Sequence, residues 1–110
     1  MKELKTPKEI LEKDLPNRFK PEKAKGIDTV VQMNIKGHSG GNWIVAIKNM
    51  KMEIEEGIHP KPNLSIDISE TDFLDLVGGK LNGSMAFFSG KLKFKGDIAV
   101  ALKLRDAGFL

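Results

Sequence analysis

The sequence contains no cysteine and no tyrosine, and it has a single tryptophan. Without cysteine the chain can form no disulfide, offer no thiolate nucleophile and ligate no metal through sulfur. Long apolar runs are absent as well: no stretch approaches the roughly 18 consecutive apolar residues of a membrane span. The charged start is followed by no apolar run, so we expect no signal peptide. These absences favour a cytoplasmic location.

Arginine is scarce too. Of the 18 basic residues only Arg18 and Arg105 are arginines, the side chain best suited to bidentate recognition of bases and phosphates. The net charge is +3, and the lysines are spread along the whole chain. This pattern indicates an ordinary solvated surface, and we expect no nucleic-acid partner. The alternative left open is a transient contact with an anionic membrane surface.

The composition that remains is typical of a folded protein. The chain has 110 residues, of which 40% are apolar and 30% are charged, a balance that supports a core and argues against disorder. This length is enough for one core and too short for two. Because the chain has no internal repeat, low-complexity tract or linker, we expect a single domain over residues 1–110.

The first expected element is a helix that begins after Thr6. Thr6 and Glu9 form a capping box, with Pro7 at the first helical position. Pro16 is expected to end this helix, because proline cannot donate the next backbone hydrogen bond. A second short helical piece is expected over residues 21–25. The apolar stripe of the first helix consists of Ile10, Leu11 and Leu15.

From residue 27 onward apolar residues alternate with polar ones, which predicts strands. Residues 27–35 and 43–47 form the arms of a hairpin, joined by the glycine-rich segment 37–42. A third strand is expected over residues 50–54 and a fourth over residues 64–68. Because each strand is apolar on one face only, one side of the sheet should be covered by helices and the other should meet water.

The second half of the chain combines helices with one more strand. Ser69 caps a helix that has acidic residues in its first turn. A short helix is expected over residues 83–89, a last strand over residues 91–95 and a final helix over residues 98–107. This order predicts an α+β fold, and the sheet can be mixed because helices separate the fourth and fifth strands.

The candidate catalytic motifs have structural explanations. Residues 37–41 match the G-x-S-x-G pattern of hydrolases, with Ser39 in the middle, but that motif requires a strand-to-helix turn, and here it joins two strands. A catalytic triad also needs a base, and no pattern places His59 near this serine. His38 and His59 are too widely spaced to indicate a metal site.

Two other motifs are equally weak. Residues 78–80 and 90–91 resemble the end of a phosphate-binding loop, but Leu81 and Leu92 stand where a hydroxyl must hold the metal. The acidic cluster in residues 53–56 is typical of a solvated strand edge. We therefore expect no enzyme, no cofactor and no metal site.

What remains is a surplus of large apolar side chains in the second half of the chain. The final expected helix is apolar nearly all round at its start, so it should have contacts on more than one side. Two explanations stay open: a tightly packed core, or a concave site for an apolar ligand. Methionine, as at Met85, suits such a site because it adapts to ligands of different shape. The aromatic members are Phe73, Phe87, Phe88, Phe94 and Phe109.

The same region carries a resemblance. Residues 79–82, 86–97 and 101–104, with the pattern G-K-L…A-F-x-x-G-K-L-K-x-x-G-D, resemble the C-terminal half of the sterol carrier protein type 2 family. Upstream, residues 21–27 and 69–76 follow in the order expected for that family. The resemblance covers essentially the whole chain.

This resemblance implies a five-stranded mixed sheet covered on one face by helices, which enclose a hydrophobic tunnel partly closed by the final helix. It also implies non-catalytic binding or transfer of sterols, fatty acids, acyl-CoA esters or phospholipids. By position, the expected lining residues are Val45, Ile47, Ile66, Phe73, Leu76, Val77, Leu81, Met85, Phe88, Leu92, Phe94, Val100 and Leu104.

The chain departs from the family pattern in two places. Family members often carry Pro-Gln where this chain has Gly83-Ser84, which predicts a different start for the short helix. The chain ends in residues 108–110 without the peroxisomal address. The missing address and the Lys/Glu-rich composition together indicate a prokaryotic cytoplasmic member of the family. In such a member we expect a fatty acyl or isoprenoid ligand rather than a sterol. The alternative is an accessory module with a filled core that binds a partner protein.

Overall fold

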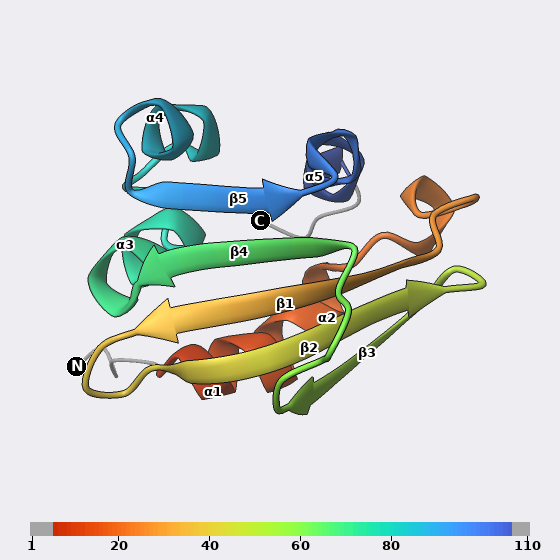
Figure 1. Cartoon of the computed structure of the whole chain (residues 1–110), viewed down its shortest axis with the longest axis horizontal. Coiled ribbons are helices and arrows are strands. Elements are labelled where there is room, and N and C mark those ends of the chain that lie inside the picture. The colour runs from red at the N-terminus through yellow and green to blue at the C-terminus, as the bar shows by residue number, and fades with distance from the viewer. Residues whose placement is uncertain (1–5, 107–110) are drawn as a thin grey trace.

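A five-stranded sheet, with helices on one face, makes up the computed structural model, which describes residues 6–106 (Figure 1). The strand order is β3-β2-β1-β4-β5. Strands β1 and β4 are parallel and the other neighbours are antiparallel, so the predicted mixed α+β sheet is confirmed. The helical elements are α1 (Pro7–Glu9), the π-helical η1 (Ile10–Asp14), α2 (Leu15–Arg18), the 3₁₀-helical η2 (Pro21–Lys23), α3 (Glu70–Val77), α4 (Gly83–Phe88) and α5 (Ile98–Asp106). The strands are β1 (Thr29–Lys36), β2 (Gly41–Lys48), β3 (Lys51–Glu56), β4 (Leu64–Ser69) and β5 (Leu92–Gly96).

The N-terminal helix begins with the predicted cap. The backbone N–H of Glu9 donates to Oγ1 of Thr6 at 3.3 Å. One turn of this helix is joined to β3 by an ion pair between Nζ of Lys8 and Oε1 of Glu56, 2.9 Å apart. The hydrogen bond and the charge of Glu56 raise the pKa of Lys8 above its usual value. Because both side chains are more than half exposed, water screens this pair and its contribution to stability is small.

The helix does not end at Pro16, so that prediction was wrong. It widens into a π-turn over Ile10–Asp14, where the N–H of Leu15 donates to the carbonyl of Ile10, five residues back. Proline has no N–H and its ring clashes with the carbonyl four residues before it in a regular α-helix. The wider turn removes that conflict, and the helix continues through Pro16 to Arg18.

Two other boundaries differ from the prediction. Met50, expected in the third strand, lies in the turn before it: Asn49 and Met50 have φ angles of 53° and 63°, so β3 begins at Lys51. The helical piece predicted over residues 21–25 is the single 3₁₀ turn η2. The predicted hairpin is confirmed, because β1 and β2 pair antiparallel. Its glycines are needed for the turn, since a Cβ at Gly40 would overlap the carbonyl oxygen of Ile35.

The core lies between the sheet and the helices. Alternate side chains of the three central strands are buried on the helix-covered face, as their period of two predicts. The N-terminal helical segment adds Ile10, Leu11 and Leu15 to this core, and α3 adds Phe73 and Leu76. The core residues of the sheet are Val31, Met33, Ile35, Trp43, Val45, Ile47, Leu64, Ile66, Ile68 and Leu92.

The outer face of the sheet is only partly open to water, which the sequence did not predict. The segment 57–63 leaves β3 at one edge and crosses β2 and β1 before entering β4 (Figure 1). Gln32 on β1, 4% exposed, holds this segment. Its Nε2 donates to the carbonyl of Gly57 at 3.0 Å, and its Oε1 accepts from the N–H of His59 at 2.8 Å. Asn63 then pairs with both backbone groups of Val30.

We predict that Gln32→Met destabilises the fold by about 1–3 kcal/mol, because it leaves the carbonyl of Gly57 and the N–H of His59 without partners. The control is Lys36→Met, which places the same side chain at an exposed position of the same strand and should change stability by less than about 0.5 kcal/mol. Urea unfolding measures both. Equal stabilities for the two variants would show that Gln32 does not hold the crossing segment.

Candidate functional site

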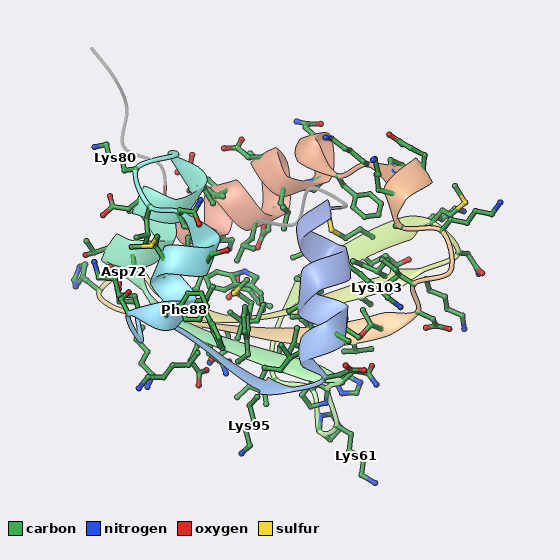
Figure 2. All side chains as sticks on the ribbon, turned by 90° about the horizontal axis from the view of Figure 1, so that it is seen from above. Lys61, Asp72, Lys80, Phe88, Lys95 and Lys103 are labelled. Carbon is green, nitrogen blue, oxygen red and sulfur yellow. The ribbon has the colours of Figure 1, made fainter. Side chains whose placement is uncertain are left out.

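All helices lie on one face of the sheet, and Lys61 and Lys95 extend from the other face (Figure 2). On the helix-covered face, η1 lies against β3, and α3 lies against β1 and β4. Helix α4 contacts β5, whereas α5 contacts β4. The candidate site is therefore the region where α4 and α5 cover β4 and β5.

The predicted lining residues fall into groups by depth. Four are half-buried against the core: Val77, Leu81, Phe94 and Val100. Met85 and Phe88 are exposed, by 63% and 82%. Leu104 belongs to α5, but its side chain lies outside the described residues, as does Phe109. The group that is fully part of the core consists of Val45, Ile47, Ile66, Phe73, Leu76 and Leu92.

Strand β5 directs its apolar side chains toward the helices. Phe94 pairs with Ile66 of β4, and both belong to or pack against the core. The alternating lysines lie on the opposite face, where Lys93 pairs with Asp67 and Lys95 with Ser65. The predicted alternation around Phe94 is confirmed, and this strand contributes one wall of the candidate site.

Helix α4 attaches to the sheet through a small residue. Asn82 caps it, accepting from the N–H of Ser84 at 2.8 Å. Ala86 is the buried residue of this helix, whereas Met85 and Phe88 are exposed. Because an alanine contact buries little area, α4 leaves most of its large apolar side chains outside the core.

Three phenylalanines form an aromatic cluster at this edge of the sheet, defined here as Phe87, Phe88 and Phe94. The ring of Phe87 stacks on Phe94 of β5 with 5.3 Å between centroids, and it meets Phe88 edge-on at 5.7 Å. Phe87, 40% exposed, was not among the predicted lining residues. A helix of six residues is too short for its periodicity to decide which of two adjacent phenylalanines faces the strand.

Helix α5 has the start that its sequence predicts, with Asp97 accepting from the N–H of Ala99 at 3.1 Å. A Cβ at Gly96 would overlap the carbonyl oxygen of Asn63, so the chain needs a glycine where it turns into α5. Among the described side chains of this helix, Val100 and Ala101 pack against the core, whereas Ile98 is 42% exposed. Helix α5 therefore contacts the sheet over β4.

The groups that suggested other chemistry take part in structural contacts. The N–H of Ser39 donates to Oε1 of Glu70 at 2.8 Å, which joins the hairpin turn to α3. Nδ1 of His59 accepts from the N–H of Lys61 at 3.0 Å. Within residues 6–106, no three histidine or acidic side chains gather in a way that could hold a metal ion. In the same range, no helix has the length and apolar character to cross a membrane.

Comparison with known proteins gives a consistent result. Residues 8–107 match the SCP-2 sterol transfer family. The chain is 37% identical over 84 residues to hydroxysteroid dehydrogenase-like protein 2 of Xenopus laevis, covering 76% of this chain and 20% of that protein. It is 38% identical over 85 residues to sterol carrier protein 2 of Gallus gallus, covering 74% of this chain and 16% of that protein. The chain thus spans a fifth or less of these curated relatives.

Among solved structures, palmitated SCP2L2 from Aedes aegypti superimposes with a TM-score of 0.74. The two chains are 27% identical, and the superposition covers 93% of each. Most of the chain therefore has a structural counterpart in a protein of similar length.

We predict that Phe94→Ala lowers the free energy of unfolding by about 2 kcal/mol, because it removes a half-buried ring and the stacking contact of that ring with Phe87. Phe88→Ala is the matched control: the same substitution at an 82% exposed position should change stability by less than about 0.5 kcal/mol. Thermal and urea unfolding of both variants test this. A larger loss for Phe88→Ala would mean that its ring belongs to the packed core.

Proposed function

The chain belongs to the SCP-2 sterol transfer family, and on this premise we propose that it binds the apolar chain of a lipid between the sheet and helices α4 and α5. The observation that carries the proposal is the concentration of exposed apolar side chains on these two helices. Met85, Phe88 and Ile98 stand out beside the half-buried Phe94 and Val100. A lipid chain would cover surface that the protein itself leaves open.

Uneven packing of the two halves of the molecule supports this placement. Val45, Ile47 and Phe73 are fully buried, so the core under β1, β2 and α3 has no room for a ligand without displacing side chains. Over β4 and β5, the short helix α4 buries only Ala86, and α5 packs against the core through Val100 and Ala101 among its described side chains. A chain inserted there needs only helix displacement, which costs less than repacking the core.

The lipid would be carried without chemical change. A lipid carrier needs surface and shape, whereas catalysis needs an acid–base pair, a nucleophile or a metal beside the substrate. The serine and histidine that suggested such chemistry lie apart from this site: Ser39 is in the hairpin turn, where its backbone N–H donates to Glu70, and His59 is in the crossing segment, where its backbone N–H donates to Gln32. The cytoplasmic location expected from the absence of cysteine is part of this proposal.

A fatty acyl chain is the ligand that we propose first. The solved relative from Aedes aegypti is described as palmitated, and a single chain is the ligand shape that fits between two helices and a strand edge. A sterol is the second ligand to test, since it gives the family its name.

Helix α5 is proposed to act as a lid. Among its described side chains, Val100 and Ala101 pack against the core whereas Ile98 is exposed, and the helix follows Gly96, which has a φ angle of 112°. Undocked, it would expose the interior and an apolar surface able to touch an anionic membrane, to which nearby lysines are attracted. Docked on a ligand, it would gain contacts that the empty site does not provide.

A second candidate function is an accessory module that binds a partner protein. The length comparison favours it, because this domain makes up only 16–20% of the curated relatives cited above. In that case the aromatic cluster would be covered by another domain or protein rather than by lipid. Native mass spectrometry separates the two: a co-purifying lipid supports the carrier, and a lipid-free protein that binds no lipid supports the module.

We predict saturable binding of a fluorescent fatty acid with a dissociation constant of about 1 μM or lower, equivalent to about −8 kcal/mol. Phe88→Ala should weaken this binding several-fold while leaving stability unchanged, because the ring is exposed without ligand and covered with it. Lys61→Ala, on the outer face (Figure 2), is the control and should bind as the unaltered protein does. Titrations of fatty acid, acyl-CoA and sterol that all fail to saturate would refute the carrier function.

The lid predicts a specific pattern of hydrogen exchange. Amides of residues 98–106 should exchange faster than those of β1 in the ligand-free protein, because α5 opens locally. Bound fatty acid should slow their exchange, whereas amides of β2 should change little. If α5 is as protected as the central strands without ligand, it is a fixed wall and lipid enters elsewhere.

A further inference from the structure

The two edges of the sheet carry opposite charges on the same face. In the described part of the chain, β3 pairs only with β2 and β5 only with β4, so each has one side without a neighbouring strand. On the outer face, β3 exposes Glu53 and Glu55, whereas β5 exposes Lys93 and Lys95. Within residues 6–106, none of these four side chains forms an ion pair. One edge of the sheet is therefore acidic and the other is basic.

The backbone groups at the two edges are compatible with each other. The N–H of Gly57 donates at 3.0 Å to a carbonyl of β2, and the N–H of Asp97 donates at 3.0 Å to the carbonyl of Asn63 beside β4. Because the hydrogen-bonding groups of an antiparallel strand alternate between its two sides, the odd-numbered residues of both strands bond inward. The even-numbered residues, Ile54 and Phe94 among them, therefore direct their N–H and C=O groups outward at both edges.

The strand directions fit as well. Strands β3, β1 and β4 run the same way, and β5 runs the opposite way. A second copy placed beside the first in the same orientation therefore brings its β3 antiparallel to β5, with both outer faces on one side. In one register Glu53 lies opposite Lys95 and Glu55 lies opposite Lys93. The same register places Ile54 opposite Phe94 on the inner face, where both pack against the core.

Pairing of two identical edges is less favourable. Two β3 strands paired along their length place Glu53 opposite Glu53 or Glu55. Two β5 strands place lysine opposite lysine. Like charges directly opposite each other destabilise a strand pair, and exposed charges on edge strands commonly prevent such pairing. The charges of β3 and β5 thus favour the other edge over a second copy of the same edge.

We propose that copies of this chain associate through their sheet edges, with the acidic β3 edge of one copy against the basic β5 edge of the next. Figure 2 looks at β5 from its free side: the helices that carry Phe88 and Lys103 lie to one side of the strand, and Lys95 extends to the other. The contact is head-to-tail, so every assembly keeps one free β3 edge and one free β5 edge and can grow further. The inference does not depend on lipid binding.

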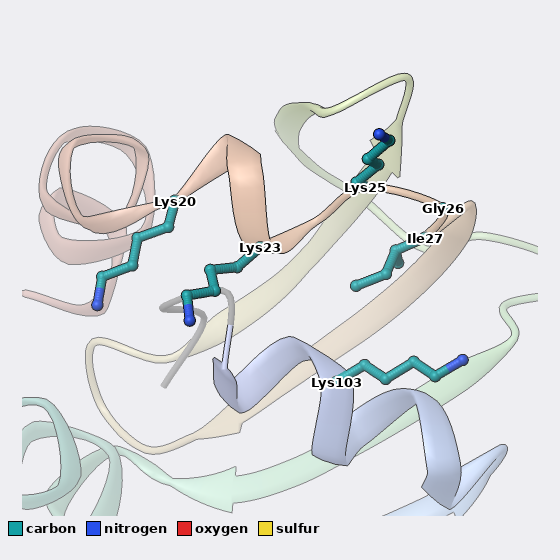
Figure 3. A pocket seen from close by; sticks show the side chains of 6 residues that line it. All are labelled: Lys20, Lys23, Lys25, Gly26, Ile27 and Lys103. Atoms are coloured by element: carbon teal, nitrogen blue, oxygen red, sulfur yellow. The ribbon is translucent and has the colours of Figure 1, made fainter.

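The other lysine-rich part of the surface offers no such match. Lys20, Lys23, Lys25 and Lys103 line a cavity of about 390 Å³ between η2 and α5. Lys25 and Lys103 point away from Lys20 and Lys23 (Figure 3). These ammonium groups follow no strand edge, so they present no row of charges to β3. Lys20 and Lys23 are both exposed and serve as control positions.

Charge reversal at the two edges tests the proposal. In sedimentation at low salt, the mass of the unaltered protein should rise with concentration beyond twice the monomer mass of 12.2 kDa. Glu53→Lys/Glu55→Lys makes both edges basic, and Lys93→Glu/Lys95→Glu makes both edges acidic. Each variant alone should stay monomeric, whereas their equimolar mixture should associate again, because every basic edge then meets an acidic one.

Two controls accompany this experiment. Lys20→Glu/Lys23→Glu changes the net charge by the same amount as Lys93→Glu/Lys95→Glu, but away from the edges, and should associate as the unaltered protein does. At about 1 M salt, where the screening length is about 3 Å, association of the unaltered protein should weaken.

Cysteine cross-linking tests the register. The chain has no cysteine, so Glu55→Cys and Lys93→Cys each supply a single thiol, on opposite edges of the sheet. Opposed residues at a site without backbone hydrogen bonds have Cα atoms about 4.5 Å apart, within the roughly 4.4–6.8 Å of disulfides. Mild oxidation of the mixture should give the mixed disulfide dimer. Glu55→Cys mixed with Lys36→Cys, an exposed position on the central strand β1, should give little.

The outcomes decide the proposal. A protein that stays monomeric at millimolar concentration, or whose mass stops at a dimer, would overturn the head-to-tail contact. Association that the mixed variants do not restore would place the contact elsewhere. Circular dichroism checks that each variant is folded. If a new carboxylate at position 93 beside Asp67 unfolds the chain, mixing Glu53→Lys with Lys95→Glu, one opposed pair, repeats the test.

Discussion

The parallel pairing of β1 with β4 is the constraint on which the rest of the structure depends. It forces the segment 57–63 to cross the outer face of the sheet, where Gln32 satisfies the backbone groups of Gly57 and His59. The crossing delivers β4 to the far side of β1, with β5 beside it. In that position β4 and β5 form the part of the sheet that α5 and α4 contact. The outer face thus determines where the candidate site lies on the inner one.

Packing density differs between the two ends of that sheet. Around β1 and β2, long strands and the N-terminal helix bury their side chains completely, and a π-turn lets the helix pass Pro16 without interruption. Around β5, helix α4 contributes the buried Ala86 and the 40% exposed Phe87, whose ring stacks on the half-buried Phe94. A protein that must open repeatedly needs one part that stays folded while another moves. This division suits the proposed carrier function.

The sequence by itself determined the elements and their faces. Period-two alternation identified all five strands and placed Phe94 inward between lysines, because side-chain direction in a strand depends only on local geometry. The cap at Thr6 and the hairpin glycines were equally local. Only the tertiary structure decided that β4 lies parallel to β1, that Gln32 is buried and that Phe88 is exposed. Each of these depends on contacts between segments far apart in the chain, which no local pattern encodes.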